Sequence, residues 1–320
     1  MWNAITDVPG ILVGQVSDMD AITGCTVLVF PDGAVGGVDI RGSATGTREI
    51  DTLSALHLAS RVHAITLAGG SAFGLDAAGG VMRALEEQNI GFPTRAARVP
   101  IVPAAIVYDL GIGSATRRPD ADMGYAACRA AAAGSVEEGN AGAGAGATVG
   151  KLFGMAQAMQ GGVGTASQSL HDSLWIGALV VCNAFGDVVD PITGQLLAGT
   201  RHAPETMTLA DTAKLLRAGV EPGRVEGSNT TLAVVATNAH LSKPQAQKLA
   251  QLAQHGCVRG LSPAHTVFDG DIVFAVSTGG VAADLTQLGV IAAELLATCL
   301  GRAVRAARSI GGVPGLGDNA

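Results

Sequence analysis

One stretch of the sequence, residues 226–238, joins a polar run directly to an apolar one. The polar run ends at Asn229, and Thr230 and Thr231 open a β-branched apolar run over residues 232–236, which predicts a buried strand. One interpretation is a loop that enters a core strand, with two threonines chosen for strand propensity. The other is that the Thr230 hydroxyl attacks the carbonyl of Asn229 and forms an ester that water then releases. Thr230 would then carry a free α-amine and act as nucleophile and base together.

Composition limits the kind of fold. The 320 residues allow two domains, although single α/β domains of this length are common. Hydrophobic residues make up 48% and charged residues 15%, which excludes the disordered class. Aromatic residues make up only 3% and there are 45 glycines, so small side chains dominate. Such a chain suits tight turns and layers packed close together.

Charge and targeting signals limit the partners. The net charge is −7 and no basic patch is visible, so nucleic acid is not expected as a partner. The N-terminus lacks the features of a signal peptide, and no apolar run approaches the ~20 residues of a membrane span. We therefore expect a cytoplasmic protein that does not bind membranes.

Cysteine and histidine spacing gives no sign of a metal site. The seven histidines form no HxxxH or HxH cluster, and the cysteines form no CxxC pair, so neither a metal nor a cofactor is expected. The cysteines are expected to be reduced and buried as small hydrophobic residues. They are Cys25, Cys128, Cys182, Cys257 and Cys299.

The order of expected elements indicates the fold class. Besides the strand after Thr230, we expect strands at residues 5–14, 24–30, 34–40, 63–67, 101–107, 174–182, 185–190 and 266–276. The turn signal at residues 31–33 predicts a hairpin. Helices are expected at residues 68–88, 119–138, 209–218, 242–258 and 279–309, the fourth of them capped by Ser242. Hairpins beside long helices predict an αββα sandwich of the α+β class, not a Rossmann fold or TIM barrel.

A glycine-rich loop at residues 139–151 raises the question of nucleotide binding. A phosphate-binding loop needs Gly where Ala145 stands and Ser or Thr where Leu152 stands, so the motif does not match. Lys151, at the end of this loop, is either a surface lysine or a cation directed at a pair of carboxylates.

Asp269 and Asp271 are the candidate carboxylate pair. Residues i and i+2 of a strand point to the same side, so both can face one site. Side by side they would raise each other's proton affinity, and a nearby lysine would keep them ionised. The alternative is a turn, because Asp-Gly is a common hairpin signal. His265 precedes the pair and could help to shape it.

Two further polar residues follow apolar strands. The amide of Asn183 could donate a hydrogen bond to an oxyanion, although an Asn at a strand end often makes only a local turn bond. Tyr108 could hydrogen-bond a tetrahedral intermediate, or be a core tyrosine with its hydroxyl at the rim. Cys182 is a poor nucleophile candidate because it has no adjacent histidine or cation.

Taken together, these segments resemble the self-processing aminopeptidases of the L-aminopeptidase/D-esterase (DmpA-like) family, which includes β-peptidyl aminopeptidases and nylon-oligomer hydrolases. The resemblance covers nearly the whole chain. It is carried by residues 5–14, 25–27, 67–76, 102–110 and 146–151, and most specifically by residues 229–238 and 265–271.

The resemblance implies an αββα sandwich that resembles N-terminal-nucleophile hydrolases. It implies scission between Asn229 and Thr230, favoured by strain in the turn of residues 228–230. The products would be an α chain of residues 1–229 and a β chain of residues 230–320 that remain one domain. Processed protomers would assemble as homotetramers.

The resemblance also assigns roles to the candidate residues. Thr230 is the nucleophile, with Asn183 and Tyr108 around the oxyanion and Lys151, Asp269 and Asp271 around the nucleophile. The type aminopeptidases use Ser as nucleophile and carry Ser and Glu at positions 269 and 271. The combination of Thr with Asp-Gly-Asp resembles the nylon-oligomer hydrolases instead.

Three functions remain open at this point. The first is an aminopeptidase that releases N-terminal amino acids from small peptides, amino acid amides or esters, or an endo-acting hydrolase of ω-amino acid oligomers. The second is acyl transfer of the ornithine acetyltransferase kind. The third is a binding or scaffold protein that has lost its chemistry.

Overall fold

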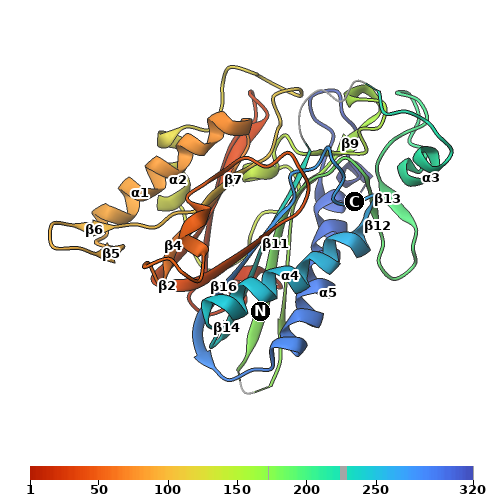
Figure 1. The fold of residues 1–320 in the computed structure, drawn as a ribbon. Coiled ribbons are helices and arrows are strands. Elements are labelled where there is room, and N and C mark those ends of the chain that lie inside the picture. Colours follow the sequence, from red (N-terminus) through yellow and green to blue (C-terminus); the bar gives the residue numbers. More distant parts are fainter. Residues whose placement is uncertain (172, 224–228, 320) are drawn as a thin grey trace.

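The computed structural model describes residues 1–171, 173–223 and 229–319, and it arranges them in four layers (Figure 1). Helices α1 (Ala77–Glu87) and α2 (Ala121–Arg129) cover one sheet, and helices α4 (Lys243–Gly260) and α5 (Leu285–Ala306) cover the other. The inner faces of the two sheets form a core of their own. The predicted αββα sandwich of the α+β class is thus confirmed.

The two sheets share one strand. In the hydrogen-bonded order, the strands are β10 (Gly162–Ser169), β11 (Trp175–Asn183), β14 (Thr230–Ala239), β16 (Ile272–Val281), β2 (Thr23–Ile40), β4 (Val62–Ala68), β7 (Ala104–Ile106) and β3 (Thr47–Arg48). Strand β1 (Leu12–Asp18) also pairs with β2. Strands β14 and β16 are parallel, whereas β11 and β14 are antiparallel.

The remaining described elements are short. They are helix α3 (Thr212–Arg217), strands β5 (Phe92–Pro93), β6 (Arg98–Val99), β8 (Thr148–Val149), β9 (Met159–Gln160), β12 (Asp187–Val189), β13 (Leu196–Ala198) and β15 (Leu261–Ser262), and the 3-10 turns Ile5–Asp7, Ile50–Leu53, Ser71–Asp76, Gly142–Gly144, Met155–Gln157 and Gly317–Asn319.

Strand β2 is a single strand of 18 residues, so the predicted hairpin at residues 31–33 is wrong. Its first half pairs with β1 and β4, and its second half pairs with β16 in the other sheet. The pairing with β4 shifts register between Val29 and Ala34, where Gly33 has a φ of +70°. The Pro-Asp-Gly signal therefore marks the exposed bend at which one strand crosses between sheets.

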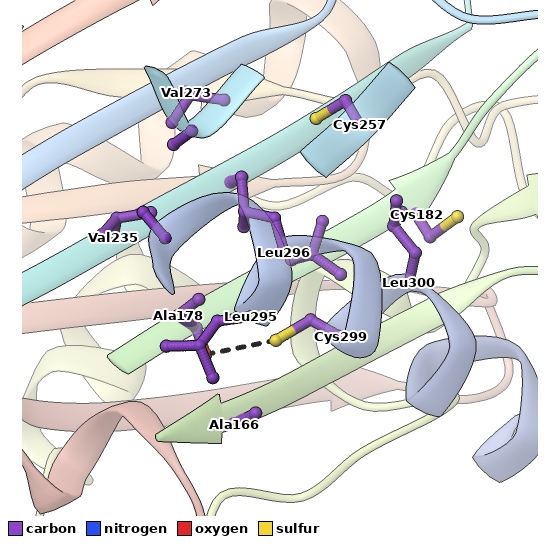
Figure 2. Close-up of a cluster of buried hydrophobic side chains, with 14 of the residues drawn as sticks. Ala166, Ala178, Cys182, Val235, Cys257, Val273, Leu295, Leu296, Cys299 and Leu300 are labelled. Carbon is purple, nitrogen blue, oxygen red and sulfur yellow. Dashed lines mark hydrogen bonds between the residues drawn. The ribbon is translucent and has the colours of Figure 1, made fainter. Parts of the chain in front are cut away.

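Successive side chains along a strand point into two different apolar cores. Along β14, Leu232 and Val234 face the core between the sheets, whereas Ala233 and Val235 face α4 and α5. Because successive side chains point to opposite faces of the sheet and both faces are buried, the strand must be apolar at every position. Figure 2 shows this outer core, in which strand side chains such as Val235 and Cys182 gather around Leu296 and Leu300 of α5.

All five cysteines are free and buried, as the sequence predicts. Three of them belong to the outer core shown in Figure 2. The thiol of Cys299 donates to the carbonyl oxygen of Ala178 at 3.6 Å. Burial raises the pKa of Cys182 to about 12, which agrees with its expected lack of nucleophilicity.

Glycines let the helices lie directly on the sheets. A Cβ added to Gly164 in β10 would lie 2.0 Å from the carbonyl oxygen of Cys299 in α5. A Cβ at Gly37 in β2 would lie 2.2 Å from the amide nitrogen of Gln247 in α4. The high glycine content therefore serves close packing of layers, as expected.

Three predicted helices differ in extent from those observed. Helix α1 begins at Ala77 and not at residue 68, because the 3-10 turn Ser71–Asp76 precedes it. Helix α2 ends at Arg129 rather than near residue 138, because Ala132 leaves the helix and pairs with Val13 of β1 through two main-chain hydrogen bonds. Helix α5 begins at Leu285, where Asp284 caps it by accepting from the amide of Gln287, and not at residue 279. In α2 a bond to a distant strand overrides local propensity, whereas a local capping residue sets the start of α5.

Helix α5 also corrects the expectation about apolar runs. Its 22 residues, with a mean hydropathy of 1.4 over the most apolar window, are long and apolar enough to cross a membrane. Within the fold, 72% of that window is buried, and the helix packs on β10 and β11 as a core helix.

We predict that Gly164→Ala destabilises the protein by about 1–3 kcal/mol, because the new methyl group has no space beneath α5. Gly79→Ala in α1 is the matched control, since its Cβ would meet nothing closer than an arginine nitrogen at 3.9 Å. That control should be neutral or slightly stabilising. Urea unfolding measures both, and equal unfolding midpoints for the two variants would contradict the packing argument.

Candidate active site

Thr230 is the first residue of β14, and it pairs with Asn183, the last residue of β11. The preceding Asn229 forms a parallel bridge with Asp269, and its carbonyl oxygen accepts from the amide of Gly270 at 2.6 Å. Thr230 is fully buried, and its hydroxyl makes no hydrogen bond to any residue that the structure describes. The expected turn at residues 228–230 begins at Ser228, which lies outside the described residues.

Asn183 is held in one orientation by three partners. Its Oδ1 accepts from Lys151 Nζ at 2.9 Å and from the Thr148 amide at 3.0 Å, which identifies the other amide atom as the donor. Its Nδ2 donates to the main-chain oxygen of Tyr108 over a long 3.3 Å. One Nδ2 hydrogen remains for an oxyanion, and Tyr108 contributes its carbonyl group to this arrangement.

Lys151 is buried beside Asn183. Its ammonium group donates to both the side-chain and the main-chain oxygen of Asn183, and it forms no ion pair with Asp269 or Asp271. Lys151 was expected to face these carboxylates; its hydrogen bonds go to Asn183 instead, and its charge interacts with Asp269 without an ion-pair contact. Burial lowers the pKa of Lys151 to about 7, and the charge of Asp269 only partly opposes this.

Asp269 and Asp271 precede β16 instead of lying within it, so strand alternation does not explain their placement. Asp269 accepts from the Phe185 amide at 3.0 Å and from both the amide and the hydroxyl of Thr266. Asp271 accepts from the amide of Thr231 at 2.7 Å. Neither carboxylate bonds the Thr230 hydroxyl, although both border its strand. Burial, and then the charge of Asp271, raise the pKa of Asp269.

Gly270, between the two carboxylates, makes room for the nucleophile candidate. A Cβ at this position would lie 2.3 Å from the oxygen of Ala44 and 3.0 Å from the hydroxyl oxygen of Thr230. Only glycine therefore lets the loop pass this close to Thr230.

His265 completes the contacts of Asp271. Its Nδ1 lies 2.8 Å from Asp271 Oδ2, and its Nε2 is buried with no hydrogen-bond partner among the described residues. The backbone of His265 has a φ of +53°, an uncommon conformation for a residue other than glycine. The sequence suggested that His265 shapes the pair, and the structure shows the contact that does so.

A cavity of about 160 Å³ adjoins these residues. Thr230 does not reach its surface, because Asn229 forms that part of the wall. The lining residues are Tyr108, Asp109, Gly111, Ile112, Gly146, Thr148, Lys151, Met155 and Asn229.

Sequence reasoning missed Asp109, a buried carboxylate on the cavity wall. The available signal was its position directly after Tyr108 at the end of an apolar strand.

As for metals, no group of three or more His, Cys, Asp or Glu side chains among residues 1–171, 173–223 and 229–319 could hold an ion.

Comparisons with known proteins agree with this architecture. The model of peptidase family S58 matches residues 3–316. An uncharacterized aminopeptidase of Mycobacterium leprae is 41% identical, covering 98% of this chain and 92% of its own length. A 6-aminohexanoate-oligomer endohydrolase of Agromyces sp. is 33% identical, covering 91% of this chain and 82% of its own length.

A solved structure supports the fold independently. The L-aminopeptidase D-Ala-esterase/amidase of Ochrobactrum anthropi superposes with a TM-score of 0.71 at 20% identity, covering 98% of this chain and 88% of that one. It is described as a variant of the Ntn-hydrolase fold. The resemblance to self-processing aminopeptidases is thereby confirmed: this chain belongs to peptidase family S58 and is a hydrolase of peptide and amide bonds.

Proposed function

We propose that this chain cuts itself between Asn229 and Thr230 and then acts as an aminopeptidase with Thr230 as its N-terminal nucleophile. The observation that carries the proposal is the Thr230 hydroxyl, which is buried without a described hydrogen-bond partner beside an oriented amide donor. Buried polar groups in native proteins are nearly always paired, so an unpaired hydroxyl at this place suggests function.

In the self-cleavage step, the Thr230 hydroxyl oxygen attacks the carbonyl carbon of Asn229 and gives up its proton. The bond between that carbon and the Thr230 nitrogen breaks, and the nitrogen takes a proton. Water then hydrolyses the ester and leaves a carboxylate on Asn229 and a free amine on Thr230. Asn183 Nδ2 is suited to hydrogen-bond the oxyanion, because Lys151 and Thr148 fix the opposite atom of the amide.

In turnover, the new α-amine has a reference pKa of about 7.7–8.0 and takes the hydroxyl proton as Thr230 attacks the substrate amide. The amine side of the substrate leaves with a proton, and water hydrolyses the acyl-enzyme. Asp271, which already accepts from the Thr231 amide, holds the first residues of β14 in place. Loss of Asn229 from the cavity wall would open Thr230 to the substrate.

Endo-hydrolysis of ω-amino acid oligomers is the second candidate. It is supported by the 33% identity to a 6-aminohexanoate-oligomer endohydrolase and by the Asp-Gly-Asp sequence at residues 269–271. Two assays separate the candidates. An aminopeptidase hydrolyses p-nitroanilides of α-, β- or ω-amino acids, whereas an endohydrolase cuts the internal amide bonds of longer ω-amino acid oligomers.

We also propose that the chains of residues 1–229 and 230–320 stay together, and that processed protomers assemble as homotetramers in the cytoplasm. Light scattering of the cut protein during gel filtration measures the assembly.

The nucleophile can be tested with a matched pair of isosteric variants. Thr230→Val should give one uncut chain without amidase activity, because it lacks the attacking hydroxyl. Thr231→Val removes a neighbouring buried hydroxyl that is also without a described partner, and it should still be cut. A denaturing gel and N-terminal sequencing of the smaller fragment measure both. Amidase turnover by Thr230→Val would remove Thr230 from the mechanism.

The oxyanion role predicts a large effect at Asn183. Asn183→Ala should slow both self-cleavage and the kcat of the cut fraction by about 10²–10³-fold, as is typical for loss of one such donor. Cys182→Ala changes the neighbouring side chain, which faces the outer core, and should leave both rates within a few-fold. A kcat for Asn183→Ala within tenfold of wild type would argue against the role.

The lowered pKa of buried Lys151 leads us to expect that the stability of the protein depends on pH. Its pKa is lowered from 10.5 to about 7 on folding, so between these values the unfolded chain binds more protons than the folded one. The free energy of unfolding should therefore rise with pH across this window, by up to about 1.4 kcal/mol per pH unit. Urea unfolding of uncut Thr230→Val at pH 7 and 9.5 measures the slope.

Adding Lys151→Met to that uncut chain should remove this contribution, whereas adding Lys248→Met, at an exposed position, should keep it. An unchanged slope in the Lys151→Met chain would mean that the folded protein does not disfavour the charged lysine.

A further inference from the structure

We propose, on the basis of the function proposed above, that Asp109 is the receptor for the free amino group of the substrate. The expected ligand is an ammonium group on a short aliphatic acyl chain. Asp109 is 5% exposed and forms part of the wall of the cavity that Lys151 and Asn229 also line. This assigns amine recognition to a different carboxylate from the Asp269 and Asp271 pair.

The carboxylate of Asp109 is fixed but not saturated. Oδ1 accepts from the Gly70 amide and Oδ2 accepts from the Thr23 hydroxyl, each at 2.6 Å. The main-chain amide of Asp109 itself is a third donor to the carboxylate. A carboxylate offers about four acceptor positions, so these donors hold the group in place and leave about one position for an ammonium.

Two neighbouring glycines leave space for the side chain of Asp109. A Cβ at Gly69 would lie 2.0 Å from Asp109 Oδ2, and a Cβ at Gly146 would lie 2.8 Å from the Asp109 Cβ. Both neighbours must therefore be glycine for Asp109 to occupy this place. Gly146 also borders the cavity, which connects this requirement to the binding space.

The other carboxylates near the site are committed elsewhere. Asp269 accepts three hydrogen bonds and Asp271 contacts Thr231 and His265, and neither lines the cavity. Among the lining residues that the structure describes, Asp109 is therefore the one carboxylate that a cationic ligand meets.

Burial raises the pKa of Asp109, and the hydrogen bonds from Thr23 and Gly70, followed by the positive charge of Lys151, partly offset this. A bound ammonium group would lower the pKa of Asp109, as the charge of Lys151 does. A charged donor is also the strongest hydrogen-bonding partner for a buried carboxylate.

The size and lining of the cavity limit the ligand. A volume of about 160 Å³ is close to that of cavities that hold a benzene molecule, so a chain of a few methylene groups fits. Ile112 and Met155 provide apolar contact, and Lys151 connects the cavity to Asn183. An aminoacyl group could thus place its amine on Asp109 and its carbonyl toward Asn183.

Amine binding can be measured without catalysis, because the cavity exists in the uncut chain. Uncut Thr230→Val is titrated with n-butylamine or n-butanol at physiological salt, with the methyl resonances of Met155 and Ile112 as the readout. We expect butylamine to bind more tightly. Asp109→Asn in the same chain should weaken butylamine by about 10- to 100-fold and change butanol little, as expected for a lost charged hydrogen bond.

Asp122→Asn is the matched control, since it makes the same change at an exposed carboxylate of α2 that does not line the cavity. It should retain the preference for the amine. Equal weakening of amine and alcohol by Asp109→Asn would overturn the proposal. If Asp109→Asn does not fold, the uncut Thr230→Val chain decides alone, because butylamine that binds no more tightly than butanol also overturns it.

Activity gives an independent readout in cut enzyme. The ratio of kcat/KM for β-alanyl-p-nitroanilide over propionyl-p-nitroanilide should fall about 10- to 100-fold in Asp109→Asn and stay unchanged in Asp122→Asn. An equal loss on both substrates would assign Asp109 a structural role only. If wild type hydrolyses no p-nitroanilide of an α-, β- or ω-amino acid, the proposed function fails, whereas the butylamine titration still decides the role of Asp109.

Discussion

The antiparallel pairing of β11 with β14 is the interaction on which the site depends. It runs for eight residue pairs through the middle of a buried sheet and ends with Asn183 opposite Thr230. Every residue of β14 is buried, so neither strand can slide by one position without turning its apolar side chains to the wrong face. The ladder thus sets the distance between an amide donor and a hydroxyl with no flexible loop between them, which is what a preorganised site requires.

Burying so many polar groups beside this ladder carries a cost that hydrogen bonds largely offset. Asp269 accepts three hydrogen bonds, and Lys151 donates two. Of the five buried side-chain atoms without a hydrogen-bond partner among the described residues, three lie close to the same place, namely the hydroxyls of Thr230 and Thr231 and Nε2 of His265. Strain and unsatisfied groups persist where the surrounding structure holds them, and they often mark function.

Local patterns predicted much of this fold correctly. The strand after Thr230 and the helix capped by Ser242 were predictable because an apolar run and a capping signal depend on neighbouring residues alone. Strand β10 was not predicted, because glycine and small polar residues there carry no strand signal and are held by pairing with β11. The bend in β2 was taken for a hairpin because the same three residues suit both.

The sequence alone determined which chemical groups the site contains, since Thr230, Asn183, Lys151 and the two aspartates stand out by type and position along the chain. Only the tertiary structure decided how they are connected. Lys151 donates to Asn183 and not to a carboxylate, Asp271 contacts His265, and Asp109 borders the cavity. The contact of Lys151 with Asn183 joins residues 32 apart, and the contact of Thr23 with Asp109 joins residues 86 apart. Which strand ends lie side by side follows from sheet order and layer packing, and neither is encoded in any short segment.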